Sequence, residues 1–120
     1  MAEHNELGTK GEELAIVHLR SLGYEIMATN WHTQKEEIDI VAMDGNMLVM
    51  VEVKTRSTGY FGEPQVFVNR NKQKLLIKAA NDYIRLKGFR GECRFDIISI
   101  VMPEGKQPRI DHLKDAFYPY

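Results

Sequence analysis

The chain has 120 residues, of which 43% are hydrophobic and 28% charged, and its formal net charge is −1. This length predicts one globular domain over residues 1–120, and because the N-terminus is acidic and no apolar run approaches ~20 residues, we expect neither export nor a membrane span. The single cysteine, Cys93, excludes an intramolecular disulfide and a multi-cysteine zinc site, and it indicates a cytoplasmic protein.

The charge is divided unevenly along the chain. Residues 1–53 contain three basic against ten acidic residues, whereas residues 54–94 contain ten basic against three acidic ones. The basic middle part could face a phosphate backbone while the acidic first part holds a metal ion. The same charges could instead only solvate helix surfaces, and their distribution alone favours this second interpretation.

The first predicted element is a helix over residues 10–22. Thr9 and Glu12 have the spacing of a capping box, and Gly23 supplies a C-terminal stop. The apolar residues between them recur at helical spacing: Leu14, Ala15, Leu19 and Leu22.

Three strands are expected next, over residues 24–30, 37–43 and 47–55. The second alternates in polarity, which predicts Ile38, Ile40 and Ala42 on one face. Asp44-Gly45-Asn46 is a strong hairpin turn signal between the second and third strands.

The second half of the chain predicts a helix over residues 69–87 and a strand over residues 94–102, after a loop over residues 57–64. The apolar residues of the C-terminal tail are too sparse to assign an element. The expected order is therefore αβββαβ, with the second helix crossing between two parallel strands of a mixed sheet.

Charged side chains converge on one face of the predicted hairpin. Because side chains alternate along a strand, Glu37 and Asp39 share a face, as do Glu52 and Lys54. A Gly45-Asn46 loop places Asp39 opposite Glu52, whereas an Asp44-Gly45 loop places Glu37 there. Both registers put all four side chains on the same side of the sheet.

Carboxylates that face one another across strands destabilise a sheet unless a cation lies between them. Oxygen ligands without cysteine or histidine favour a hard ion such as Mg²⁺ or Mn²⁺, and the four histidines show no ligand-like spacing. Alternatively, Lys54 supplies the neutralising charge and the cluster is an exposed polar face.

These hairpin residues resemble those of a known family. Asp39 followed by Glu52-Val53-Lys54 is similar to the Asp…(Asp/Glu)-x-Lys motif of the restriction-endonuclease-like superfamily. The wider pattern resembles the bacterial YraN family of predicted endonucleases in these segments: Gly11-Glu12 with Ala15, Gly23-Tyr24, Asn30-Trp31, Glu37-Ile38-Asp39, Val51 to Arg56, Lys72, and Arg94-Phe95-Asp96. The chain departs from this family at Glu36, where glycine is usual.

The resemblance implies a restriction-endonuclease-like αβββαβ core related to Holliday-junction resolvases, with a Mg²⁺-dependent (or Mn²⁺-dependent) nuclease site. In that site Asp39 and Glu52 would ligate the metal, with the carbonyl of Val53 as a further ligand. Lys54 would orient or activate the attacking water, and Glu12 would complete the acidic site.

The partner implied by this reading is DNA, branched or processed DNA included. Thr55 and Arg56, with Lys72 and Lys74 of the second helix, are the candidates for phosphate contacts. The alternatives are a non-catalytic nucleic-acid-binding module of the same fold and a small protein whose acidic patch binds a basic partner. A homodimer that aligns two basic faces would compensate for the near-neutral net charge.

Overall fold

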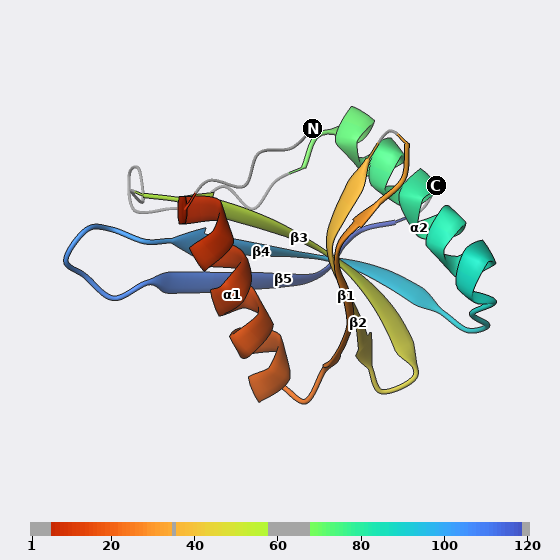
Figure 1. The fold of residues 1–120 in the computed structure, drawn as a ribbon, viewed down its shortest axis with the longest axis horizontal. Coiled ribbons are helices and arrows are strands. Elements are labelled where there is room, and N and C mark those ends of the chain that lie inside the picture. The colour runs from red at the N-terminus through yellow and green to blue at the C-terminus, as the bar shows by residue number, and fades with distance from the viewer. Residues whose placement is uncertain (1–5, 35, 58–67, 119–120) are drawn as a thin grey trace.

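The computed structural model describes residues 6–34, 36–57 and 68–118, which form helices on a five-stranded sheet. In chain order the elements are α1 (Glu6–Ser21), β1 (Glu25–His32), β2 (Glu37–Asp44), β3 (Met47–Arg56), α2 (Arg70–Lys87), β4 (Cys93–Val101) and β5 (Arg109–Phe117) (Figure 1). The predicted αβββαβ order is present, followed by a further strand. All but the first residue of the predicted 57–64 loop lies outside the described residues.

The sheet has the order β1-β2-β3-β4-β5. Strands β3 and β4 run parallel, and the other three neighbouring pairs are antiparallel. The parallel pair is joined through α2, as a crossover between parallel strands requires. The expected α/β fold with a mixed sheet and flanking helices is therefore confirmed.

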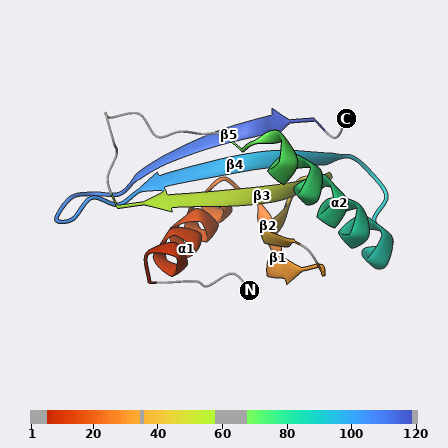
Figure 2. The ribbon, with the colours of Figure 1, turned by 90° about the horizontal axis from the view of Figure 1, so that it is seen from above.

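The two helices cover opposite faces of this sheet. Ala15 and Leu19 of α1 belong to one apolar core with Ile98, whereas Leu76 of α2 belongs to another with Ile97. Since adjacent residues of a strand point to opposite faces, the two cores are separated by the sheet. Figure 2 shows the helices toward opposite ends of the long strands β3, β4 and β5.

The β2–β3 turn adopts the first of the two expected registers. Asp44 pairs with Met47, and the ladder continues to Ile40 and Val51. Gly45 opens the two-residue loop with φ 62°, a left-handed conformation that glycine adopts without a steric penalty. Continued by one step, this register places Asp39 opposite Glu52.

The alternation predicted for β2 is wrong at one position. Ile40 packs in the core beneath α1, but Ile38 packs in the core beneath α2. The cause lies in β1, where Asn30 has φ 50° between the Thr29–Ile40 and Trp31–Ile38 pairs. This left-handed residue kinks the hairpin opposite Asp39, so the faces exchange there.

The N-terminus of the first helix also differs from the prediction. The helix begins at Glu6, so Thr9 lies within it and cannot be its N-cap. Leu7 is half-buried and stands one turn before Gly11, which extends the buried stripe toward the N-terminus. Glu6 also places an acidic side chain in the first turn, where the helix dipole favours it.

The C-terminal tail, whose sparse apolar residues predict no element, forms β5 on the edge of β4. Its pattern is interrupted because the register shifts between Phe95 and Ile97 and because Asp115 has φ 55°. Phe117 then stacks on Phe95 with ring centroids 4.8 Å apart. Pairing with β4, rather than alternation of its own, stabilises this strand.

Helix α2 agrees closely with the range predicted for it. The side chain of Asn69 caps the helix by accepting a hydrogen bond from the N–H of Lys72 at 2.9 Å. Gly88 ends it in a left-handed conformation with φ 65°. These caps fix which helical residues point toward the β1–β2 hairpin.

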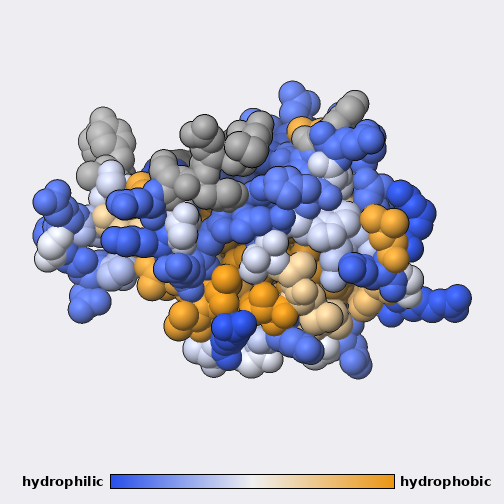
Figure 3. Space-filling view, viewed as in Figure 1, coloured by the Kyte–Doolittle hydropathy of each residue, from blue (hydrophilic) through white to orange (hydrophobic). Residues whose placement is uncertain are grey.

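Neither helix in the described part of the chain is long and apolar enough to cross a membrane. The face shown in Figure 3 is mostly hydrophilic, with apolar side chains gathered over α1. In that helix Val17 is 64% exposed and Leu22, just after it, is 48% exposed.

Candidate metal centre

The site is built around Asp39, at the point where the β2–β3 ladder stops. The last paired residues are Ile40 and Val51. Beyond them, Oδ2 of Asp39 accepts a hydrogen bond from the N–H of Val53 at 2.8 Å. A side chain thus replaces the next backbone bond of the ladder, and the carboxylate is anchored against β3.

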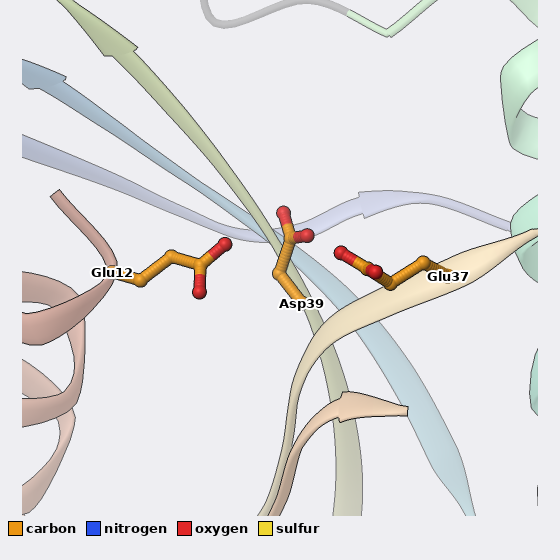
Figure 4. Close-up of side chains that lie close together, drawn as sticks. All are labelled: Glu12, Glu37 and Asp39. Carbon is orange, nitrogen blue, oxygen red and sulfur yellow. The ribbon is translucent and has the colours of Figure 1, made fainter. Parts of the chain in front are cut away.

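Two further carboxylates meet Asp39 from different elements. Glu12 reaches it from α1 and Glu37 from the start of β2, and one oxygen from each of the three side chains lies within 4.8 Å of the others. Figure 4 shows the three carboxylates pointing toward one another. Hydrogen bonding with Glu52 of β3 adds a fourth carboxylate beside Asp39.

Glu12 reaches this position because α1 approaches β3 very closely. A Cβ atom at Gly11 would lie 2.0 Å from Oγ1 of Thr55, so only glycine fits there. Thr55, a candidate phosphate contact from the sequence, therefore packs against the helix that carries Glu12. Close packing at Gly11 is what brings the acidic residue of α1 to the sheet.

The electrostatics of the site follow from this crowding. Burial raises the pKa of Asp39 to about 8, the charge of Glu52 adds to the effect, and the hydrogen bond from Val53 opposes it. Burial also raises the pKa of Glu52, although Lys72 and Lys54 act in the opposite direction. Asp39 and Glu52 therefore share a proton more readily than they both ionise, unless a cation is supplied.

One side of the site already contains a cation from α2. The Nζ atom of Lys72 lies 3.1 Å from both carboxylate oxygens of Glu36 and 3.8 Å from Oε2 of Glu52. Burial alone would lower the pKa of Lys72, but the charges of these two carboxylates outweigh it and raise the pKa. The ammonium therefore remains charged and bridges β3 to the residue before β2.

The comparisons with known proteins agree over nearly the whole chain. Residues 11–100 match the model of Uncharacterised protein family UPF0102. UPF0102 proteins of Flavobacterium psychrophilum and Christiangramia forsetii are 52% and 50% identical to this chain. Each alignment covers 98% of this chain and 98% of the relative. A UPF0102 protein of Porphyromonas gingivalis is 43% identical over 98% of this chain and 87% of its own. The chain belongs to the UPF0102 family.

Membership in UPF0102, which is the YraN family, confirms the resemblance read from the motifs. The family description names no activity, so the chemistry of this UPF0102 protein has to be argued from its side chains. The three clustered side chains offer carboxylate oxygens only, and Nε2 of His32 lies 3.0 Å from Oε1 of Glu37 at the edge of the cluster. Such donors suit a hard divalent cation, and Glu12, Glu37 and Asp39 are the residues placed to hold it.

The remaining predicted residues of this UPF0102 chain lie around the cluster. Lys54 is close enough for its charge to act on Glu52. Lys74 is exposed on α2, two residues after Lys72. Arg56 is half-buried at the end of β3, and its carbonyl accepts a hydrogen bond from the N–H of Met102 at 2.8 Å. The N–H of Val53 is directed to Asp39, while a ligand role for its carbonyl stays a prediction.

Sequence reasoning missed Glu36 as a member of the site. Alternation places it on the face opposite Glu37, but it precedes β2 and is not bound by the strand's period. The run Glu36-Glu37 was the available signal, because it places a second carboxylate directly before the strand that carries Asp39. The basic residue that pairs with Glu36, Lys72, is distant in sequence and only the fold reveals it.

A second polar network of the UPF0102 fold fixes the elements around the site. Asp96, 1% exposed, accepts hydrogen bonds from Arg94 and from the N–H of Asp115, and it bonds the Nε2 atom of His112 at 2.8 Å. The other ring nitrogen of His112 lies 3.1 Å from Nε2 of His18 on α1. This chain of contacts ties α1 to β5 and β4, although the spacing of the histidines gave no sign of it.

Proposed function

We propose that this protein is an endodeoxyribonuclease that uses Mg²⁺ or Mn²⁺ to hydrolyse phosphodiester bonds of DNA in the cytoplasm. The observation that carries the proposal is the meeting of Glu12, Glu37 and Asp39 within 4.8 Å, beside Glu52 and Lys54. A purely structural role would gain nothing from gathering like charges around a partly buried aspartate.

The residues have distinct roles in this proposal. Asp39 would hold the metal ion together with Glu12 and Glu37. Glu52 lies beside them through its hydrogen bond to Asp39, and the carbonyl of Val53 is a further candidate ligand. A bound divalent ion would polarise the phosphate and lower the pKa of the attacking water. Lys54, two residues after Glu52, orients that water and donates to the developing charge.

The surface beside the cluster supplies the phosphate contacts. Lys74 is exposed on α2, and Thr55 and Arg56 lie at the end of β3. We propose that these residues position the DNA backbone, since phosphate contacts fix register without reading sequence. The scissile phosphate would then lie between the basic end of β3 and the acidic cluster.

One observation favours a second candidate, a non-catalytic nucleic-acid-binding module of the same fold. Lys72 already neutralises Glu36 and Glu52 without any metal. A site satisfied in this way could have a structural role only. The two candidates differ in whether divalent ions bind and whether DNA is cut.

A cleavage panel tests the proposal directly. Single-stranded, duplex, flap and four-way DNA are incubated with the wild-type protein in Mg²⁺, in Mn²⁺ and in EDTA. We expect metal-dependent cutting of at least one substrate by wild type and by Glu13→Gln, which changes an exposed neighbour of Glu12. We expect none with Asp39→Asn. DNA binding without cutting under all metal conditions would favour the non-catalytic module.

A further inference from the structure

Lys72 occupies one side of the acidic cluster in the manner of a bound cation. Its Nζ atom lies 3.1 Å from both oxygens of Glu36 and 3.8 Å from Oε2 of Glu52. The side chains of Glu36 and Glu52 are each 13% exposed, and that of Lys72 is 35% exposed. Two poorly solvated carboxylates therefore meet one partly exposed ammonium at this point.

The cluster consequently has two halves. Glu12, Glu37 and Asp39 form the half whose carboxylates come within 4.8 Å of one another. Glu36 and Glu52 form the other half, and Lys72 bridges them. Glu52 connects the halves, because it also shares a hydrogen bond with Asp39.

This division resembles the layout of a site for two ions. Paired divalent ions in phosphodiester-cleaving enzymes lie roughly 3.5–4 Å apart and share carboxylate ligands. Here one of the two places is flanked by Glu36 and Glu52 and holds an ammonium. An ammonium carries one charge and cannot leave the site, whereas a divalent ion exchanges with solvent.

We propose that Lys72 is a built-in cation in the place of a second divalent ion, so that the cluster binds a single ion between Glu12, Glu37 and Asp39. The inference rests on the proposed function only in that the cluster must bind metal. It makes Lys72 a positioning residue for Glu52, in place of the phosphate contact expected from the sequence. Any cleavage then proceeds with one ion, and Lys54 activates the water.

Mn²⁺ titration by calorimetry tests the inference on the full chain. We expect wild type to bind one ion and Lys72→Met to bind two, because the variant removes the ammonium that neutralises Glu36 and Glu52. Lys74→Met is the matched control, since it removes the same charge from an exposed position on the same helix. Lys72→Arg keeps the cation, and we expect it to bind one ion.

The outcomes separate this inference from the proposed function. One ion in wild type, Lys74→Met and Lys72→Met alike, with equal affinity, would overturn the inference and leave the metal site intact. No Mn²⁺ bound by any of the four proteins would overturn both.

Melting curves keep the test decisive if Lys72→Met folds poorly. Without metal, its two unneutralised carboxylates should lower the melting temperature below that of Lys74→Met. Mn²⁺ should then raise the melting temperature of Lys72→Met more than that of Lys74→Met. A variant that Mn²⁺ does not restore would show that the ammonium does not stand in for an ion.

Discussion

Asp39 combines an anchor on one strand with negative charge from two other elements. Burial and the neighbouring carboxylates raise its pKa to about 8, which means that the folded protein retains a proton that the unfolded chain releases near pH 4. The contribution of Asp39 to stability without metal must therefore fall as the pH rises from about 4 toward 8, and level off above that. A cation in the site would remove this dependence by favouring the ionised form.

Asp39→Asn tests this account at a single residue. The amide keeps the shape of the side chain and cannot ionise. We therefore expect the metal-free variant to be more stable than wild type at pH 8, by roughly 2 kcal/mol or more in the free energy of unfolding, given ~1.4 kcal/mol per pKa unit. Urea denaturation from pH 5 to 8 in EDTA measures this. The stability of wild type relative to the variant should fall over that range, because the two proteins share every other titrating group. Parallel pH profiles for the two proteins would show that Asp39 ionises normally.

The same variant should lose its response to metal. Millimolar Mg²⁺ or Mn²⁺ should stabilise wild type by RT ln(1 + [L]/Kd) and so raise its melting temperature. The melting temperature of Asp39→Asn should not change with either metal. Glu13→Gln serves as the control and should respond as wild type does. An unmoved wild-type melting curve in both metals would remove the basis for the nuclease.

Lys54→Met separates catalysis from metal binding. A lysine is not a metal ligand, so the rise in melting temperature with Mn²⁺ should survive the change. Cleavage should fall by about 10²-fold or more, the usual contribution of a group that transfers or orients a proton. A variant that cuts DNA at the wild-type rate would assign the activation of water to another group.

At the scale of the elements, most of the fold follows from local patterns. Helical spacing and caps predict α2 to within a residue, and the crossover predicts the parallel β3–β4 pair. The errors in the strands occur where one residue leaves the regular backbone: Asn30 kinks β1 and turns Ile38 to the other core. Asp115 similarly hides β5. No local pattern reports a left-handed asparagine or aspartate, because their energies are set by the neighbouring strand.

The site is predictable to the extent that it lies on one hairpin. Asp39 and Glu52 follow from the two-residue turn, since strand parity alone brings them together. Glu12 came from resemblance, because its position depends on the contact of Gly11 with Thr55, which is long-range. The Glu36–Lys72 pair depends on how α2 docks and was not foreseen.

Gly11→Ala tests the contact between α1 and β3. A Cβ there would overlap the side chain of Thr55, with its Oγ1 at 2.0 Å and its Cγ2 at 2.8 Å. We expect a cost of about 1–3 kcal/mol and a displaced Glu12, seen as weaker Mn²⁺ binding by calorimetry. Adding Thr55→Ala removes the two nearest clashing atoms, leaves only the Cβ of residue 55 at 2.9 Å, and should restore part of the binding. Unchanged binding in Gly11→Ala would mean that the close contact of Gly11 with Thr55 does not set the position of Glu12.

Across the whole molecule, Asp96 holds distant elements together. Burial alone would raise its pKa, but hydrogen bonds from His112, Arg94 and the N–H of Asp115 lower it. Because the folded pKa is depressed, the stability from this carboxylate is present above the unfolded pKa near 4. That stability is lost as the pH falls through the lower folded value.

Asp96→Asn removes the charge from this network and leaves Arg94, 15% exposed, without its main partner. We expect a loss of roughly 3–5 kcal/mol, typical of breaking a buried ion pair on one side. Urea denaturation at pH 7 measures it. Asp111→Asn breaks an exposed pair with Arg109 and should cost less than about 1 kcal/mol. Equal losses in the two variants would mean that the buried network contributes no more than a surface pair.

The uneven charge along the chain predicts which part of the molecule binds DNA. Three basic against ten acidic residues over 1–53 and ten against three over 54–94 put the attraction for phosphate on the second half of the fold. Lys74 is exposed on α2, whereas Lys72 is engaged by Glu36 and Glu52. Lys74→Ala should therefore weaken duplex binding in EDTA and reduce the slope of log K against log salt by about 0.9.

Fluorescence anisotropy at several salt concentrations measures that slope. Lys106→Ala is the control, because it removes an equal charge from an exposed loop between β4 and β5, away from α2, and we expect it to leave the slope unchanged. Lys72→Met should also leave the slope nearly unchanged. In wild type the ammonium of Lys72 neutralises carboxylates, so it releases no counterions from DNA. If Lys72→Met lowers the slope as much as Lys74→Ala, then Lys72 contacts phosphate and its ion pairs open when DNA binds.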